Sequence, residues 1–218
     1  MKKIILQVIL LAAIVGLVWC LYSMFNTPLE FERLRKEREA KVVERLKDIR
    51  TAQRAFRNKY QKFTPNFDSL IAFVANDSLV VERAIGSADD SLAVAQGLVS
   101  VEKYMVAVKD TIQFVGEEVK ADLNNLRYIP GSNIPSKFNR SGQWIEFAMD
   151  TASIKTESAV VVPVLEVFAQ YPTFLGDLDE QQLINFRDYQ IKTLNRADGL
   201  KVGSLTATTN EAGNWDGE

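Results

Sequence analysis

The feature that most constrains this chain is an apolar run at its N-terminus, from Ile4 to Phe25, in which Gln7 and Ser23 are the only plainly polar residues. A helix needs roughly 20 apolar residues to cross the hydrocarbon core of a bilayer. Trp19 and Tyr22 lie near the C-terminal end of the run, where aromatic rings favour the membrane interface. The run therefore predicts one transmembrane helix over residues 4–25.

Three other interpretations of this run fit less well. A cleaved signal peptide has an apolar region of about 7–15 residues followed by a small-x-small cleavage site, and the bulky stretch Leu21–Phe25 offers no such site. A lipoprotein needs a small residue before its cysteine, but Trp19 precedes Cys20. A buried core helix is rarely so uniformly apolar at the start of a chain. We therefore expect an uncleaved membrane anchor.

The orientation of the anchor is open. Lys2 and Lys3 form nearly the whole tail before the span, which is typical of a signal-anchor with its N-terminus in the cytoplasm. The cations after the span favour the opposite orientation, because a count of Lys and Arg places the more basic flank in the cytoplasm. These cations are Arg33, Arg35, Lys36, Arg38, Lys41 and Arg45. We expect the C-terminal part to lie outside the cytoplasm.

The composition removes several classes of chemistry. A formal net charge of −2 gives no indication of nucleic-acid binding. The chain has no histidine, which excludes histidine as a general base or metal ligand, and its single cysteine, Cys20, excludes both an internal disulfide and a cysteine-based zinc site. The sequence contains no phosphate-binding glycine loop, no nucleophile elbow and no EF-hand pattern.

Three acidic clusters are the remaining candidates for catalysis, namely Asp89–Asp90, Glu117–Glu118 and Asp177–Glu180. Acidic residues favour turns and helix N-termini, so each cluster is better explained as a structural feature than as a catalytic pair. A hydrolase that uses only carboxylates stays open, since it needs no histidine. We expect no enzyme activity and no cofactor.

The segment after the span predicts a long amphipathic helix, in which Pro28 suits the first turn. Its apolar residues recur in steps of three and four and form a narrow seam. The seam is expected to pack on the chain's own domain or on a helix of another chain, including a second copy. The later half is strongly basic, which suits either a solvated face or docking to an acidic partner or lipid headgroups. The candidate partner-binding residues are Arg50, Arg54, Arg57, Phe56 and Tyr60.

Beyond this stalk the sequence predicts an α+β fold, with a small antiparallel sheet and packed helices. Strands are expected at Leu79–Val81, Leu98–Val108, Gln143–Met149, Ser153–Thr156, Ala159–Ala169 and Leu200–Leu205, a loop at Gly86–Ser91, and helices at Glu117–Leu126 and Asp179–Arg196. Pro163 places its strand at an edge or a bulge, because proline cannot donate to a sheet. The expected divisions are a cytoplasmic tail (1–3), a transmembrane helix (4–25), a stalk (26–62), an α+β domain (63–205) and a loose polar tail (206–218).

The junction of stalk and domain carries a resemblance. After the stalk, Thr64 suits a helix N-cap and Pro65 the first helical position. The stretch Asp48–Val74 loosely resembles the N-terminal region of type IV pilins and type II secretion pseudopilins, in which a long helix is followed by an aromatic turn with Thr and Pro and a short helix. The residues that carry the similarity are Asp48, Ile49, Ala52, Tyr60, Phe63, Thr64, Pro65 and Leu70.

The two ends of the chain differ in how well they match this family. The pair Asn214–Trp215 is similar to the asparagine- and glycine-rich end of pseudopilins. The prepilin cleavage motif is absent, since Gly16 is followed by Leu17 and no glutamate precedes Glu30.

The resemblance implies a structural or assembly protein of the bacterial envelope, anchored in the inner membrane, with its domain in the periplasm and with the bilayer and other protein subunits as partners. The same layout resembles the scaffold or alignment subunits of secretion and pilus machines. A membrane-tethered binding or hydrolytic domain is the alternative from another class. Pseudopilins often hold calcium near such a tail, for which Asn210, Asn214 and Asp216 are candidate ligands, whereas the composition favours a solvated tail.

Overall fold

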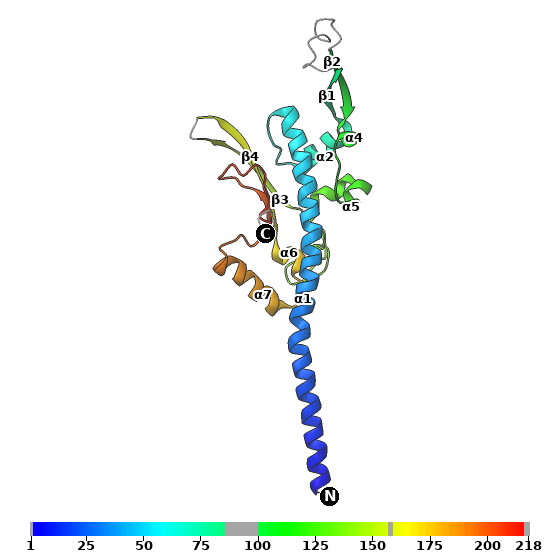
Figure 1. Ribbon diagram of the computed structural model, residues 1–218, viewed down its shortest axis with the longest axis vertical. Helices are drawn as coiled ribbons and strands as arrows, with labels where there is room; N and C mark the ends of the chain where they lie inside the picture. The colour runs from blue at the N-terminus through cyan, green and yellow to red at the C-terminus, as the bar shows by residue number, and fades with distance from the viewer. Residues whose placement is uncertain (1, 86–99, 157–158, 216–218) are drawn as a thin grey trace. The chain divides into compact units, whose positions relative to one another are not determined.

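The computed structural model describes residues 2–85, 100–156 and 159–215. Its fold is α+β, as predicted: a long N-terminal apolar helix precedes small antiparallel sheets and short helices (Figure 1). The elements are α1 (Lys2–Tyr60), α2 (Phe67–Asn76), β1 (Ser78–Ile85), β2 (Ser100–Ala107), α4 (Val108–Thr111), α5 (Glu117–Ala121), the 3-10 helix η1 (Leu123–Arg127), β3 (Ala148–Lys155), β4 (Val161–Gln170), α6 (Tyr171–Leu175), α7 (Glu180–Asp188), the π-helical turn η2 (Tyr189–Thr193) and β5 (Gly199–Gly203).

The first helix, α1, joins the predicted span and stalk in one uninterrupted element. It ends where Gln61 adopts a φ of 57° and its N–H donates to the carbonyl of Arg57 at 2.7 Å. The placement of Pro28 in a first helical turn is wrong, because Pro28 lies in the helix interior. Proline removes one backbone hydrogen bond there, and the apolar residues before it are already helical.

The second helix, α2, starts later than the sequence indicates. Its N-cap is Asn66, whose side chain accepts from the N–H of Asp68 at 2.7 Å, so the prediction of Thr64 as N-cap is wrong. The backbone of Thr64 is used elsewhere: its N–H donates to Gln53 Oε1 at 3.2 Å, and its carbonyl accepts from Gln53 Nε2 at 2.6 Å. Gln53 is fully buried, and this pair fixes the turn that follows α1.

The strands form two small sheets. Strands β1 and β2 pair antiparallel with Ser78 opposite Ala107, and the predicted loop at Gly86–Ser91 lies outside the described residues. The other sheet has the order β3-β4-β5, with Ala148 opposite Phe168. The expectation of an edge position for the Pro163 strand is wrong, since β4 is central. The end of β5, Gly203, abuts the carbonyl of Leu165, so Pro163 lies beyond the reach of β5.

Three predicted elements are shorter than expected. The strand expected at Gln143–Met149 begins only at Ala148, and before it Glu146 makes an isolated bridge to Tyr128. The helix expected at Glu117–Leu126 is divided between α5 and η1. The helix expected at Asp179–Arg196 is α7 followed by the π-helical turn, and Asn195 follows with a φ of 51°.

The chain divides into two compact units, each with its own core. The first comprises Met1–Val42, Ile129–Ile145 and Ala169–Leu200. In it Phe186 of α7 packs on Phe31 of α1, with ring centroids 6.3 Å apart. Arg35 lies over the same ring at 4.6 Å.

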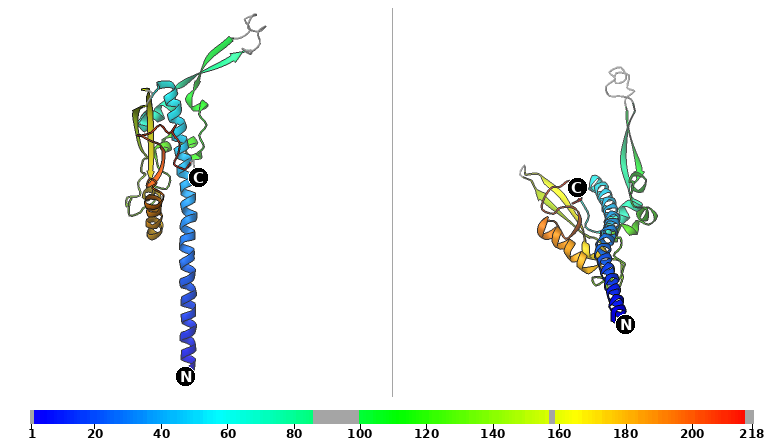
Figure 2. Two further views of the ribbon diagram at one scale, coloured as in Figure 1. Left: turned by 60° about the vertical axis from the view of Figure 1, so that its left-hand side comes forward. Right: turned by 60° about the horizontal axis from the view of Figure 1, so that its bottom comes forward.

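The second unit comprises Val43–Tyr128, Glu146–Phe168 and Lys201–Glu218. Here α1 buries Leu46, Ile49 and Ala52 completely. Figure 2 shows β3 and β4 alongside this part of α1, and Gln53 Nε2 contacts Met149 Sδ at 3.1 Å. The later half of the predicted seam therefore packs on the chain's own sheet.

Candidate functional site: an exposed apolar helix and an arginine-bound tail

The first half of α1 exposes a long apolar surface. Large apolar side chains between Ile9 and Leu29 are 50% to 72% exposed, with Trp19 the most exposed. The helix is long and apolar enough to cross a membrane, with a mean hydropathy of 2.0 in its most apolar window and none of that window buried. It is the one such helix among the residues that the structure describes. The lone cysteine, Cys20, lies in this exposed segment.

The second half of α1 binds the C-terminal tail through its arginines. Glu211 is 6% exposed and accepts from Arg54 Nε at 2.9 Å and from Arg57 Nη1 at 2.5 Å. Arg50 donates to the Glu211 carbonyl at 3.3 Å, and Arg54 also donates to the Asn210 carbonyl at 2.8 Å. All three arginines predicted to bind a partner are thus in contact with this tail.

Backbone pairing with β5 holds the same tail. Val202 and Gly213 form an antiparallel bridge, Gly203 N–H donates to the Ala212 carbonyl at 2.9 Å, and Asn214 N–H donates to the Lys201 carbonyl at 3.0 Å. The expectation of a loose tail is therefore wrong for this stretch. Its buried carboxylate needs the cations of α1, since an unpaired buried charge is costly.

The candidate calcium ligands are only partly within the described structure. Asn214 Oδ1 accepts from the Lys201 N–H at 3.0 Å, and the Asn210 carbonyl accepts from Arg54. Asp216 lies outside the described residues. Within the described ranges, no three His, Cys, Asp or Glu side chains are grouped so as to hold a metal ion.

The two aromatic candidates lie at the end of α1 and differ in exposure. Phe56 is 9% exposed and packs on Phe73 of α2, with ring centroids 5.2 Å apart, whereas Tyr60 is 43% exposed. The Tyr60 hydroxyl donates to Asp77 Oδ2 at 2.7 Å, which raises the pKa of the phenol. Hydrogen bonds from Lys59 and then Tyr60 lower the pKa of Asp77 to about 2. Asp77 thereby fastens the start of β1 to the end of α1.

A second polar contact on α1 was not singled out from the sequence. Asp48 is 1% exposed and accepts from the N–H groups of Val115 at 2.6 Å and Gly116 at 2.9 Å. Burial raises the pKa of its carboxyl, and these two hydrogen bonds oppose that shift. Arg45, 4% exposed, binds Glu118 at 2.5 Å and the carbonyl of Asn125, and burial lowers the pKa of its guanidinium.

The Asp48 and Arg45 contacts fix the segment from Val115 to Tyr128 on α1. The available sequence signal was a single acid, Asp48, three residues after Arg45 on an otherwise basic helix.

The acidic clusters have structural partners. Glu118 binds Arg45, as described, and Asp177 binds Arg38. Asp179 caps α7, its side chain accepting from the Gln182 N–H at 2.9 Å. Asp89 and Asp90 lie outside the described residues.

Two pockets occur in the second unit. One, of about 180 Å³, lies beside the tail and is lined by Arg57, residues 162–165 and residues from 204 to 211. The other, about 530 Å³ and wider, is lined by Lys109, Ile112, Gln113, Phe114, Lys120 and Leu123. Glu211 is the one carboxylate among the described residues that line either pocket, and it is already bound by two arginines. Neither pocket therefore presents a pair of carboxylates.

The sequence matches no protein-family model, no curated protein and no solved structure. The function proposed below therefore rests on the residues and contacts of this chain.

Proposed function

We propose that this protein is a single-pass, membrane-anchored structural or assembly protein of the bacterial cell envelope, pilin- or pseudopilin-like in outline, and not an enzyme. In this proposal the residues before the span lie in the cytoplasm, and the α+β part lies in the periplasm and contacts other subunits. One observation carries it: α1 is apolar and exposed between Ile9 and Leu29, and then buries Leu46, Ile49 and Ala52 in a folded unit.

The exposed half of α1 supports a bilayer as its environment. Moving a large apolar side chain out of water contributes about 1.5–3 kcal/mol, and over the segment from Ile9 to Leu29 the sum is roughly 20 kcal/mol. A folded domain is stable by only about 5–15 kcal/mol. A helix that left this surface in water would lose more than folding gains, so the segment needs lipid or other apolar helices around it.

The anchor can be tested with one charged substitution. Arginine near the centre of a spanning helix costs about 2.5–3.5 kcal/mol, so Val15→Arg should reduce the membrane-inserted fraction by roughly 100-fold relative to Val15→Leu. The measurement is the share of full-length protein that floats with liposomes and resists extraction at alkaline pH. Equal retention of the Val15→Arg and Val15→Leu proteins would refute the anchor.

A scaffold or alignment subunit of a secretion or pilus machine is the second candidate. It is favoured by Leu17 directly after Gly16 and by the lack of a glutamate before Glu30, since a processed pilin needs a cleavage motif. Mass spectrometry of the mature N-terminus separates the two functions. Cleavage after Gly16 would support the pilin-like protein, and an intact start at Met1 would support the scaffold.

A further inference from the structure

Beyond the apolar segment, one face of α1 carries charges of alternating sign. Glu30, Arg33, Glu37 and Lys41 follow one another in steps of three or four, which places them along one side of a helix. The side chains of Arg33, Glu37 and Lys41 are 66%, 54% and 59% exposed, and Glu30 is exposed as well. These four residues are called the charge ladder below.

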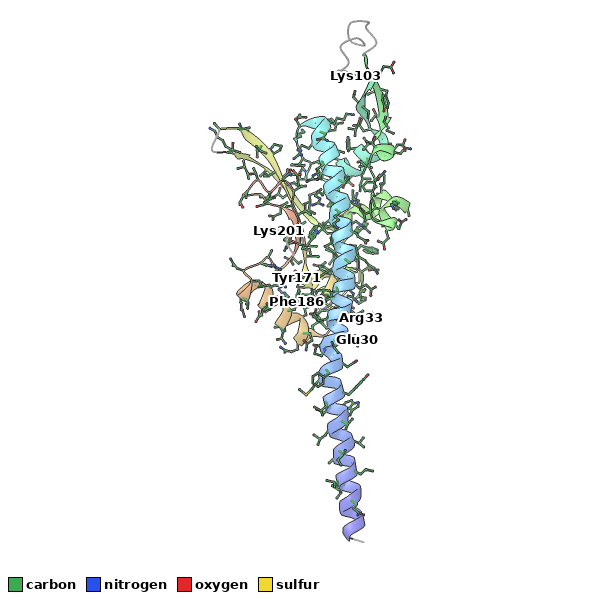
Figure 3. All side chains as sticks on the ribbon, in the orientation of Figure 1. Glu30, Arg33, Lys103, Tyr171, Phe186 and Lys201 are labelled. Atoms are coloured by element: carbon green, nitrogen blue, oxygen red, sulfur yellow. The ribbon has the colours of Figure 1, made fainter. Side chains whose placement is uncertain are left out.

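The charge ladder lies away from the packed side of α1. Figure 3 labels Glu30 and Arg33 on α1, with Phe186 and Tyr171 packed beside the helix. The packed side is held by short contacts: Arg35 binds Glu32 and Glu39, both at 2.6 Å.

Pairs within the charge ladder are longer, 3.9 Å for Arg33–Glu37 and 3.4 Å for Lys41–Glu37. Exposed pairs of this kind are weak and are readily exchanged for other partners.

We infer that the charge ladder binds the charge ladder of a second copy of this chain, with the two α1 helices parallel and in register. The inference rests on the proposed membrane anchor, because anchoring in one bilayer gives every copy the same orientation and the same depth. Neighbouring side chains across two packed helices differ by three or four positions. Glu37 of one copy therefore lies between Arg33 and Lys41 of the other, and the two-fold axis repeats these contacts.

The alternation of sign is what makes this partner fit. A helix with charges of one sign on this face would repel a parallel copy of itself, whereas the ladder places each acid beside a base of the other copy. An antiparallel arrangement also matches charges, but two copies anchored in the same bilayer cannot adopt it. The ladder thus sets register and partner choice in addition to any contact between the apolar segments.

The test exchanges the charges between copies. Full-length protein with Cys20→Ser and Asn133→Cys, the latter at an exposed site, is labelled with donor or acceptor dyes and reconstituted in neutral-lipid vesicles at a low protein-to-lipid ratio. Energy transfer then reports self-association. Glu37→Lys makes the middle of the ladder wholly basic, and Arg33→Glu with Lys41→Glu makes the ladder wholly acidic.

Each variant alone should lose about tenfold in self-association, and an equal mixture of the two should regain transfer within about threefold of the unaltered protein. Glu117→Lys makes the same change of charge as Glu37→Lys on an exposed side chain of α5 and should leave transfer unchanged. Unaltered transfer in the Glu37→Lys protein, or no recovery in the mixture, would overturn the inference.

Flotation of the same vesicles separates this inference from the anchor. Protein that does not float would disprove the anchor itself. Protein that floats and shows no transfer, or shows transfer insensitive to the ladder, would disprove only the parallel pair.

Discussion

The buried carboxylate of Asp48 gives the most specific prediction about stability. Its two oxygens accept the N–H groups of Val115 and Gly116, and it is 1% exposed. Asp48→Ala removes both acceptors at once. Each buried N–H left without a partner costs about 1–3 kcal/mol, and the buried Arg45 also loses a nearby anion. We expect a loss of about 3–5 kcal/mol in the unfolding free energy of the second unit.

Gly116 provides a second, independent probe of the same contact. Its φ of −72° and ψ of 120° suit any residue, so alanine there meets no backbone strain. A Cβ atom would however lie 2.8 Å from Asp48 Oδ2. Gly116→Ala should therefore cost about 1–2 kcal/mol, and the cause is this one oxygen.

The two substitutions together form a double-mutant cycle. In the Asp48→Ala background the obstructing oxygen is gone, so Gly116→Ala should be neutral or stabilise by about 0.5 kcal/mol. The expected coupling is thus about 1–2 kcal/mol. Thermal unfolding of the full chain in detergent gives the comparison, because each kcal/mol shifts the midpoint by about 2–4 °C in a chain of this size. Additive effects within about 0.5 kcal/mol would refute the contact.

The same carboxylate gives a pH dependence with a defined sign. Burial raises the Asp48 pKa above its ordinary 3.8, so its contribution to stability is present below pH 3.8 and is lost as pH rises through the folded-state pKa. Asp48→Asn removes this titration. The stability of the variant relative to the unaltered protein should therefore improve as pH rises from below 3.8, and a difference that widens in the other direction would contradict burial as the dominant cause.

Three further predictions concern single sites. Glu211→Ala should cost about 1–3 kcal/mol, less than a fully buried pair because its arginines are partly exposed, and limited proteolysis should then remove the tail first. Gly203→Ala should cost about 2–4 kcal/mol, since its φ is 75° and a Cβ would overlap the carbonyl behind it, whereas Gly16→Ala, with nothing within 4 Å, should be neutral or stabilising in thermal unfolding. The pKa of Asp77, about 2, should rise toward 3.8 in Lys59→Gln by NMR titration, and the stability that Asp77 provides should be lost as pH falls from about 4 to about 2.

The sequence predicted the fold class and the course of α1 because these depend on local composition. A long apolar run and a seam in steps of three and four identify a helix without any knowledge of distant residues. The prediction at Pro28 failed for a physical reason: the preference of proline for a first turn applies only where a helix starts, and here the helix had started at Lys2.

Contacts between distant residues account for the other differences. Thr64 has the residue type of an N-cap, but Gln53, eleven positions earlier, takes both its backbone N–H and its carbonyl, so the cap passes to Asn66. The acid at Glu211 is separated from Arg57 by 154 positions. Composition alone assigns such a tail to solvent, and only the folded chain shows that its carboxylate is buried.

The charged residues of α1 are not equivalent, because the surroundings of the helix change along its length. Near its end Arg54 and Arg57 already bind Glu211, so an acidic partner at that face must displace a buried carboxylate. A partner at the charge ladder exchanges only loose pairs within one helix. Glu211→Ala should therefore strengthen binding of an acidic partner to the arginines and leave the self-association of α1 unchanged. If both changed together, the two surfaces would belong to a single interface.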